Sequence, residues 1–265
     1  MSPEQLLEHA DSGALWSAEQ QASLPAELAE AYPLALAVRR LREARGEQAR
    51  GYKIGFTNSQ IWPRYQVFGP IWGTVFSSTL ALCDGQARVS LQRAAQPRLE
   101  PEAVFGMKAT PPQNASADEL FACIDWMAPG FEIVQSHAPG WKFTAAMTVA
   151  DGGLHSRLVV GRPVKVAGIA RDAEAFNAVL AACTVRLHKN GQQAEAGHLL
   201  LVQHLSLRGF EFRRALGDMA LEFQVQLLEL ARLAIELGEH LDLRAQYFRH
   251  DRHRHVIDRA HLVAA

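Results

Sequence analysis

Two glutamates flank a proline at Glu100-Pro101-Glu102, and this triplet restricts the backbone to an extended form. Proline donates no hydrogen bond to a strand ladder, so within sheets it occurs at edge strands or strand starts. On a strand, side chains two positions apart point to the same face, which places Glu100 beside Glu102. Neighbouring carboxylates repel each other unless solvent or a cation neutralises them. Residues 98–105 therefore predict an edge strand with an acidic pair.

A third acid, Glu132, lies within the apolar, β-prone run 131–134. Burying an unpaired carboxylate is costly, so Glu132 needs a partner. Three hard oxygen ligands from two strands suit Mg²⁺ or Mn²⁺, which keeps its other positions for water or substrate. The spacing alone leaves a second interpretation open, in which Glu100 and Glu102 face solvent and Glu132 forms an ordinary ion pair.

Two further residues are candidates for chemistry. Lys53 lies between apolar neighbours in the extended segment 51–57, either with its ammonium at the surface or inside an acid-lined cleft as charge partner or proton carrier. Asp151 precedes two glycines, a pattern typical of a tight turn that lets a ligand approach the backbone. An ordinary turn is the alternative for Asp151.

The balance of charge excludes some functions. The 265 residues include 27 basic and 28 acidic ones, a net charge of −1, which offers no footprint for nucleic acid or an anionic membrane. The three cysteines are widely spaced and odd in number, which indicates reduced thiols. The N-terminus lacks a signal-peptide pattern, and no apolar run reaches the length of about 18 residues that a membrane span needs. We expect a cytoplasmic protein with no nucleic-acid or membrane partner.

The chain divides into three predicted regions. Residues 1–48 are expected to be helical, with Pro33 kinking or dividing the helix over 26–44. Residues 49–198 form a β-rich core, in which Ser116 caps a helix that runs to about Met127. Residues 199–265 form a helical segment and tail, because apolar side chains recur at helical spacing from Leu216 to Leu241 and predict one or two helices over 199–249. The histidine-rich stretch 250–255 is interpreted as a solvated tail rather than a metal site.

Four segments appear together in a recognisable order, namely 51–57, 98–102, 131–134 and 149–151. They resemble the hydratase/decarboxylase branch of the fumarylacetoacetate hydrolase superfamily. Its members include 2-oxopent-4-enoate hydratase and 2-oxo-3-hexenedioate decarboxylase, enzymes of the meta-cleavage route for aromatic compounds. The similarity covers about residues 30–195.

The resemblance implies an α+β fold, a mixed β-sandwich roll preceded by helices. It also implies a Mg²⁺ or Mn²⁺ site built by Glu100, Glu102 and Glu132, a substrate-side position for Lys53, and a site-lining position for Asp151. These implications favour the metal interpretation of the three acids over the solvent-facing one.

The sequence also departs from the family. Ser77 and Ser78 stand where an acid is common, and Gly152 stands where asparagine is expected. Beyond about His198, the family's final strands are not recognisable, and the helical pattern of 199–249 takes their place. The changes at positions 77–78 and 152 could alter the substrate without removing the metal. The loss of the family's final strands could leave the core incomplete.

The predicted function is hydration of a 2-oxo-4-enoate by a metal-dependent enzyme that forms a homo-oligomer. Decarboxylation of 2-oxo-3-hexenedioate is the alternative; it would need a basic clamp for the second carboxylate, for which Arg64, Lys142 and Arg157 are candidates. A carbon–carbon hydrolase would need a water-activating His–Glu pair, which the sequence does not place. A non-catalytic subunit that associates with an active paralogue through the C-terminal helix is a further hypothesis.

Overall fold

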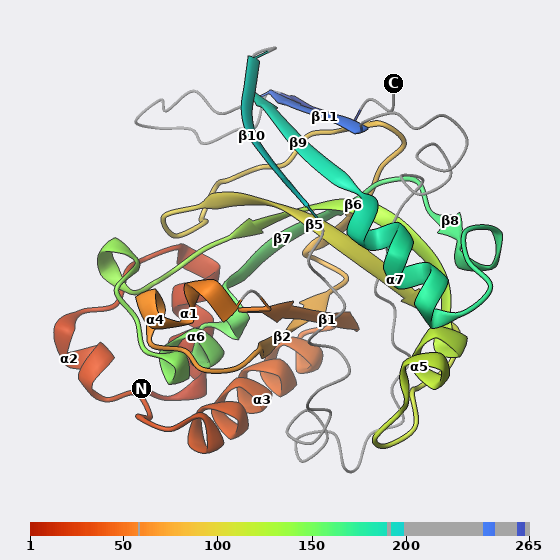
Figure 1. The fold of residues 1–265 in the computed structure, drawn as a ribbon. Helices are drawn as coiled ribbons and strands as arrows, with labels where there is room; N and C mark the ends of the chain where they lie inside the picture. Colours follow the sequence, from red (N-terminus) through yellow and green to blue (C-terminus); the bar gives the residue numbers. More distant parts are fainter. Residues whose placement is uncertain (58, 190–191, 199–240, 247–258, 263–265) are drawn as a thin grey trace. The chain divides into compact units, whose positions relative to one another are not determined.

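The computed structural model describes residues 1–57, 59–189, 192–198, 241–246 and 259–262 (Figure 1). The chain separates into two compact units. The first unit comprises Met1–Leu80, Gln92–Glu100 and Glu132–Leu158, and the second comprises Ala81–Leu91, Pro101–Phe131 and Val159–Ala265. Among the described residues, no helix has both the length and the apolar character needed to cross a membrane.

Most helices of the first unit begin at a polar cap. They are α1 (Pro3–Ser12), α2 (Ala18–Ala22), α3 (Leu28–Ala44), α4 (Trp62–Tyr65) and α6 (Ala145–Ala150), with the short 3₁₀ turns η1 (Ser59–Ile61), η2 (Pro139–Trp141) and η3 (Gly152–Leu154). Ser2 and Ser17 form capping boxes, and Thr144 caps α6. These side chains satisfy amides that a helix start would otherwise leave without an acceptor.

Helix α3 runs unbroken through Pro33, so the proline does not divide the helix. Its missing amide removes one helical hydrogen bond. The helix is nevertheless held along its length, because Ala31 lies in a buried cluster with Val67, Ile71 and Val149. Tertiary packing of this face outweighs the local defect.

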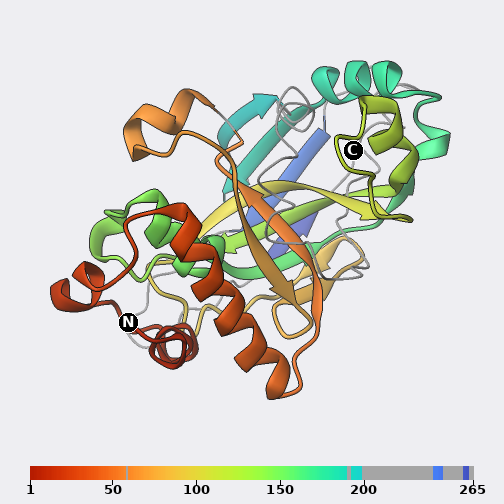
Figure 2. The same cartoon turned by 90° about the horizontal axis from the view of Figure 1, so that it is seen from below.

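Strands β1 (Ala49–Gly55) and β2 (Ile71–Phe76) form an antiparallel pair beside α3 (Figure 2). Trp72 on β2 stacks on Tyr32 of α3, with ring centroids 4.8 Å apart. The register sets Lys53 opposite Gly73. The extended conformation predicted for residues 51–57 is thus confirmed over β1.

A mixed sheet carries the acidic segments. Its hydrogen-bonded order is β3 (Leu80–Leu82), β7 (His155–Val160), β6 (Ile124–Val134) and β5 (Arg98–Met107), and β8 (Val164–Lys165) pairs with β6. Among the described strands, β5 lies at the edge of this order, as Pro101 predicts.

Helix α5 (Ala117–Cys123) begins at the Ser116 cap, as predicted, but the prediction that it runs to Met127 is wrong. Strand β6 starts at Ile124 instead. Ile124 and Met127 are buried in a cluster with Phe105, and this packing favours the extended form over the local helical pattern.

The second unit packs helix α7 (Ala173–Ala182) into the same cluster through Phe176 and Leu180. Its remaining elements are η4 (Val166–Gly168), β4 (Gln86–Ala87), β9 (Thr184–Lys189), β10 (Gln192–His198), β11 (Leu241–Gln246) and β12 (Arg259–Leu262). Strands β9 and β10 pair antiparallel.

The helix predicted over 199–249 is wrong at its end, because residues 241–246 form β11, parallel to β9. Leu241, Leu243 and Ala245 alternate with polar residues, and this two-residue period suits a strand. The rest of that predicted helix, with its apolar stripe, and the tail 250–255 lie outside the described residues.

Candidate active site

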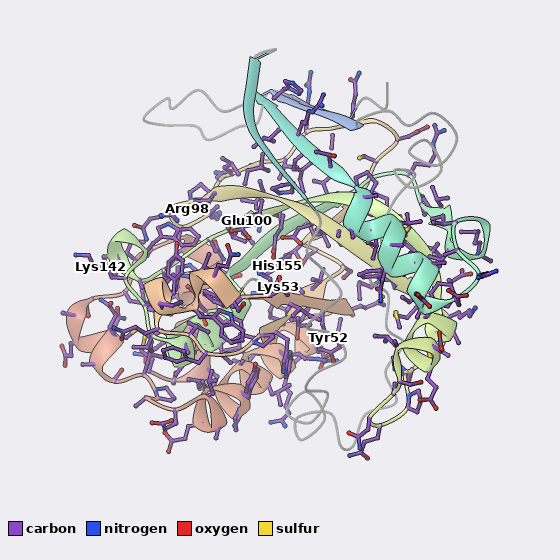
Figure 3. All side chains as sticks on the ribbon, viewed as in Figure 1. Tyr52, Lys53, Arg98, Glu100, Lys142 and His155 are labelled. Atoms are coloured by element: carbon purple, nitrogen blue, oxygen red, sulfur yellow. The ribbon has the colours of Figure 1, made fainter. Side chains whose placement is uncertain are left out.

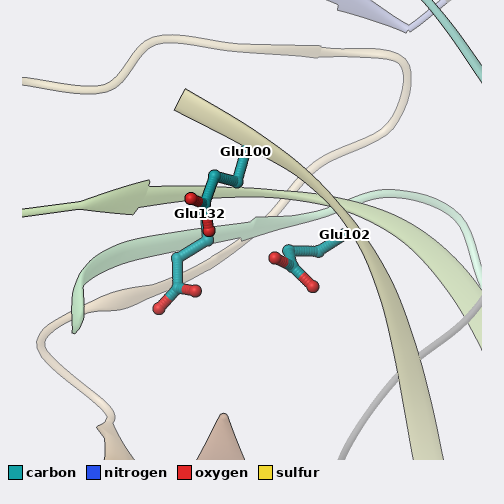
Figure 4. Close-up of side chains that lie close together, drawn as sticks. All are labelled: Glu100, Glu102 and Glu132. Carbon is teal, nitrogen blue, oxygen red and sulfur yellow. The ribbon is translucent and has the colours of Figure 1, made fainter. Parts of the chain in front are cut away.

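Three carboxylates converge from the two acidic strands (Figure 4). Glu100 and Glu102 project from β5 and Glu132 from β6, and one oxygen of each lies within 4.8 Å of the others. Oxygens bound to one Mg²⁺ lie about 3 to 4 Å apart, since each sits about 2.1 Å from the ion. Small side-chain rotations would bring the three acids to that spacing, so the donor set and its geometry fit a hard divalent cation.

Glu132 is buried, with 2% of its surface exposed, and both of its oxygens have partners. Lys53 Nζ lies 3.0 Å from Oε2, and His155 Nδ1 lies 2.7 Å from Oε1. Burial alone would raise the pKa of Glu132, but the charge of Lys53 and the hydrogen bond from His155 hold the pKa below its usual value. Glu132 is therefore an ionised carboxylate at neutral pH, as a metal ligand must be.

Lys53 lies within the acidic cluster rather than at the surface (Figure 3). Its ammonium contacts Glu132 and also donates to the Gly153 carbonyl at 3.0 Å. A Cβ on Gly73 would lie 2.0 Å from the Gly152 carbonyl oxygen, so only glycine lets β2 approach this turn. The surface alternative for Lys53 is contradicted, because only 11% of its side chain is exposed.

Glu100 has the most exposed surface of the three acids, yet its surroundings raise its pKa. Burial of its carboxylate is the main cause of a raised pKa; Lys53 opposes this effect and the neighbouring Glu132 adds to it. A divalent cation would remove the repulsion between the two carboxylates and favour their ionised forms.

His155 is a functional candidate that the sequence reasoning missed. It starts β7 and is 7% exposed, with Nδ1 on Glu132 and Nε2 2.8 Å from Thr79 Oγ1. Burial lowers the pKa of His155 in spite of Glu132, so the ring is neutral near pH 7. We assign the Nδ1 proton to the bond with Glu132, which leaves Nε2 to accept from the Thr79 hydroxyl. The sequence offered one signal for this role, namely a histidine that begins a predicted strand just after the Asp-Gly-Gly turn.

Asp151 contacts a different histidine. Its Oδ2 accepts from the His137 amide at 2.9 Å, and its Oδ1 lies 2.5 Å from His137 Nδ1. Its carboxylate thus contacts neither Lys53 nor Glu132. Asp151 instead precedes the turn at Gly152 and Gly153, both with positive φ, whose carbonyl at Gly153 accepts from Lys53.

Comparison with known proteins shows what the chain is similar to. No family model matches the chain. It is 34% identical to 2-hydroxyhexa-2,4-dienoate hydratase of Comamonas testosteroni over 63% of this chain and 61% of that protein. It is 30% identical to 2-hydroxypent-2,4-dienoate hydratase of Pseudomonas putida over 63% of this chain and 72% of that protein.

The chain belongs to the hydratase/decarboxylase branch of the fumarylacetoacetate hydrolase superfamily. It is also 28% identical to 4-oxalocrotonate decarboxylase of Pseudomonas sp. strain CF600, over 64% of this chain and 61% of that protein. It therefore spans about three fifths to three quarters of the lengths of these relatives.

A solved structure confirms the α+β fold expected for this branch. The 4-oxalocrotonate decarboxylase of Pseudomonas putida G7, complexed with magnesium and adipate, superposes with a TM-score of 0.60. The match covers 75% of this chain and 74% of that one at 22% sequence identity.

Carbon–carbon hydrolysis and decarboxylation each need groups in addition to the metal site, namely a water-activating His–Glu pair for the first and a basic clamp for the second. A His–Glu pair exists at His155 and Glu132, but both ring nitrogens of His155 have protein partners, so neither is available to activate water for carbon–carbon hydrolysis. Of the three candidate clamps, Lys142 lines a cavity with Arg98, whereas Arg157 donates to its neighbour's carbonyl, Ser156 O. The side chain of Arg64 lies outside the described part of the chain.

Proposed function

We propose that this chain is a metal-dependent lyase that adds water to a 2-oxo-4-enoate. The observation that carries the proposal is the convergence of Glu100, Glu102 and Glu132, with Lys53 in contact with the buried member. The hydratases among its relatives, which include the 34% and 30% identical proteins described above, support hydration ahead of decarboxylation. The proposal places this chemistry in the β-rich core, residues 49–198.

Glu100, Glu102 and Glu132 would hold Mg²⁺ or Mn²⁺ through carboxylate oxygens. When bound, such a cation supplies Lewis-acid stabilisation of negative charge at the 2-oxygen of the substrate. Glu132 has no freedom to turn away from this position, because Lys53 and His155 fix its two oxygens.

Lys53 is the proposed proton carrier, or the group that holds the substrate's 1-carboxylate. Its ammonium is kept beside the acids by Glu132 and the Gly153 carbonyl. Both hydration and decarboxylation of a 2-oxo acid need one proton delivered to carbon after the enolate forms. Lys53 can serve either reaction from the same position.

Asp151 is proposed to orient the lysine rather than to touch substrate. Its bonds to His137 anchor the start of the turn that ends at Gly153, and the Gly153 carbonyl accepts from Lys53. His155 acts in the same indirect way on Glu132. Both are positioning residues.

The test uses the full chain with Mg²⁺ and 2-hydroxypenta-2,4-dienoate, followed by loss of ultraviolet absorbance. We expect turnover that requires metal, and Glu102→Gln should reduce it by at least about 100-fold, in the range for removal of a strong electrostatic group. Turnover without added metal after chelation, or full activity in Glu102→Gln, would refute the ligand set. Activity that appears only after a paralogous enzyme is added would favour the non-catalytic subunit.

A further inference from the structure

Two glutamines join the segments that lie just outside the acidic strands. Strand β5 begins at Arg98 and strand β6 ends at Val134, so Gln96 precedes the first strand and Gln135 follows the second. Both glutamines belong to the first unit, as do the groups that they bond. We refer to these two side chains together as the glutamine clasp.

The Gln96 side chain bonds three main-chain groups of the segment that follows β6. Its Nε2 donates to the Ser136 carbonyl at 2.7 Å and to the Ala138 carbonyl at 2.8 Å, and its Oε1 accepts from the Gly140 amide at 2.8 Å. Ser136 and Ala138 have no exposed surface, so their carbonyls depend on donors from the protein. The main-chain carbonyl of Gln96 also accepts from the Trp141 indole at 3.0 Å.

Gln135 completes the clasp from the other strand. Its Oε1 accepts from the Ala95 amide and its Nε2 donates to the His155 carbonyl, both at 3.2 Å. The Ser136 amide adds a main-chain bond to the Ala95 carbonyl at 3.0 Å. Because His155 Nδ1 bonds Glu132, Gln135 connects the segment before β5 to the residue that orients Glu132.

The backbone that the clasp holds is strained. Gln96 has a φ of 48° and Arg93 a φ of 64°, and Trp141, which bonds Gln96, has a φ of 60°. Non-glycine residues keep such left-handed conformations only where their surroundings impose them, and these conformations gather at functional sites. The bonds of the clasp, rather than local backbone preference, therefore set the path by which the chain enters β5.

The clasp lies equally far along the chain from two of the acids. Gln96 precedes Glu100 by four residues and Ser136 follows Glu132 by four residues, which is at most about 13 Å of extended chain. One carboxylate oxygen of Glu100 lies within 4.8 Å of one of Glu132 (Figure 4). Because a close-packed interior transmits displacements, a shift at the clasp would move one acid relative to the other.

We propose that Gln96 and Gln135 are positioning residues that set the spacing of Glu100 and Glu132 and thereby favour Mg²⁺ over Ca²⁺. The inference rests on the proposed metal site and specifies how that site selects its ion. Mg²⁺ requires nearly ideal octahedral ligands at about 2.1 Å, whereas Ca²⁺ accepts a flexible geometry at about 2.3–2.6 Å. A looser pair of carboxylates therefore weakens the binding of Mg²⁺ more than that of Ca²⁺.

Gln96→Met and Gln135→Met test the clasp, since methionine removes the amide from a side chain of similar length. Calorimetry measures the affinities for Mg²⁺ and Ca²⁺ at a temperature where each variant is folded. Each substitution should lower the Mg²⁺ affinity by about tenfold and the Ca²⁺ affinity by less than about threefold. The double variant should lose less Mg²⁺ affinity than the product of the two single losses, because both residues act on one spacing.

Gln20→Met is the matched control. The Gln20 side chain bonds Ser17 and His9 in the N-terminal segment of the same unit. Loss of this capping box should lower the melting temperature but leave both metal affinities at the wild-type value. Equal losses of Mg²⁺ and Ca²⁺ affinity in the clasp variants, or losses no larger than in Gln20→Met, would overturn the proposal.

Crystal structures of the metal-free wild type and of metal-free Gln96→Met separate this inference from the proposed function. We expect the carboxylates of Glu100 and Glu132 to lie farther apart in the variant, and an unchanged distance would overturn the clasp. If the clasp controls ion selection but no dienoate is turned over, the reaction proposed above fails and the clasp stands. A wild type that binds neither ion would refute the proposed metal site, and ion selection by the clasp with it.

Discussion

The first unit contains two buried histidine–carboxylate pairs that look alike locally and behave differently. His137 and Asp151 form one pair, and His155 and Glu132 form the other. Burial lowers the pKa of both imidazoles, but Asp151 and the His9 carbonyl more than restore that of His137, whereas the pKa of His155 stays low. The contacts of the first pair therefore favour the charged form of the imidazole, and those of the second pair favour the neutral form.

The third partner explains the difference. Asp151 bonds the amide and the ring of His137. Glu132 already has Lys53 at 3.0 Å, and this nearby positive charge disfavours a second one on His155. Trp16 stacks on the His137 ring at 5.8 Å and closes that pair within the packed core. The His137–Asp151 pair anchors the turn at residues 152–153. The His155–Glu132 pair, which contacts Lys53, lies beside the other two acids of the site. The same residue types thus serve structure in one place and candidate chemistry in the other.

Replacing Glu132 with Gln should have the largest effect on stability. Lys53 would lose its buried counter-charge, and breaking such a pair costs about 3–5 kcal/mol of unfolding free energy. Chemical denaturation at pH 7 measures the loss, and calorimetry with Mg²⁺ measures metal affinity.

Glu100→Gln is the matched control for that change. Glu100 keeps the most exposed surface of the three acids and, within the described part of the chain, forms no ion pair, so its replacement should weaken metal binding with little loss of stability. Equal destabilisation by the two substitutions would contradict the special position of Glu132.

Asp151→Asn should have the second-largest effect on stability, since it removes the carboxylate that bonds both the amide and the ring of His137. Loss of hydrogen bonds to a charged group costs about 1.5–3 kcal/mol. Metal affinity should stay near the wild-type value, because Asp151 does not contact the three acids. Turnover should fall if the turn at Gly153 shifts Lys53. A metal affinity that collapses as far as in Glu132→Gln would place Asp151 in the metal site instead.

These contrasts show how far sequence reasoning could reach. The proline between two acids identified β5 as an edge strand, and the spacing placed Glu100 and Glu102 on one face, because strand geometry is local. The contact of Lys53 with Glu132 joins strands far apart in sequence, and residue spacing alone left it undecided. Only the fold decides which side of β1 the lysine faces.

The neutral state of His155 was beyond prediction for a related reason. It depends on the burial of the ring, on Thr79 as a second partner and on the charge of Lys53, and these come from separate segments of the chain. The helix ends at Cys123 rather than Met127 for the same kind of reason, since Ile124 and Met127 pack in a core that also contains Phe105. Burial set by distant residues overrides the local pattern in both cases.

The pH dependence of the unfolding free energy should also distinguish the two histidine–carboxylate pairs. We expect this effect to be smaller than those of Glu132→Gln and Asp151→Asn. The pKa of His137 is raised in the folded state, so its contribution to stability is fully present below the unfolded value of about 6.5 and disappears as pH rises through the folded pKa. Denaturation curves from pH 6 to 9 should show this decline in the wild type. His137→Gln should remove it, and a wild-type profile that is unchanged by the substitution would rule out a charged His137.

Thr79→Val should give the smallest effect and the finest test of the neutral ring. Valine keeps the shape of threonine but removes the hydroxyl, which donates to His155 Nε2 and accepts from the Phe76 amide, at a cost of about 0.5–1.5 kcal/mol in stability for each bond. Because His155 orients Glu132, metal affinity should also fall, by about tenfold, as for other residues that support a metal ligand. Thr79→Ser restores the hydroxyl and should restore the affinity. If serine fails to rescue the affinity, the methyl group of Thr79 matters through packing, and the hydrogen bond to His155 does not orient Glu132.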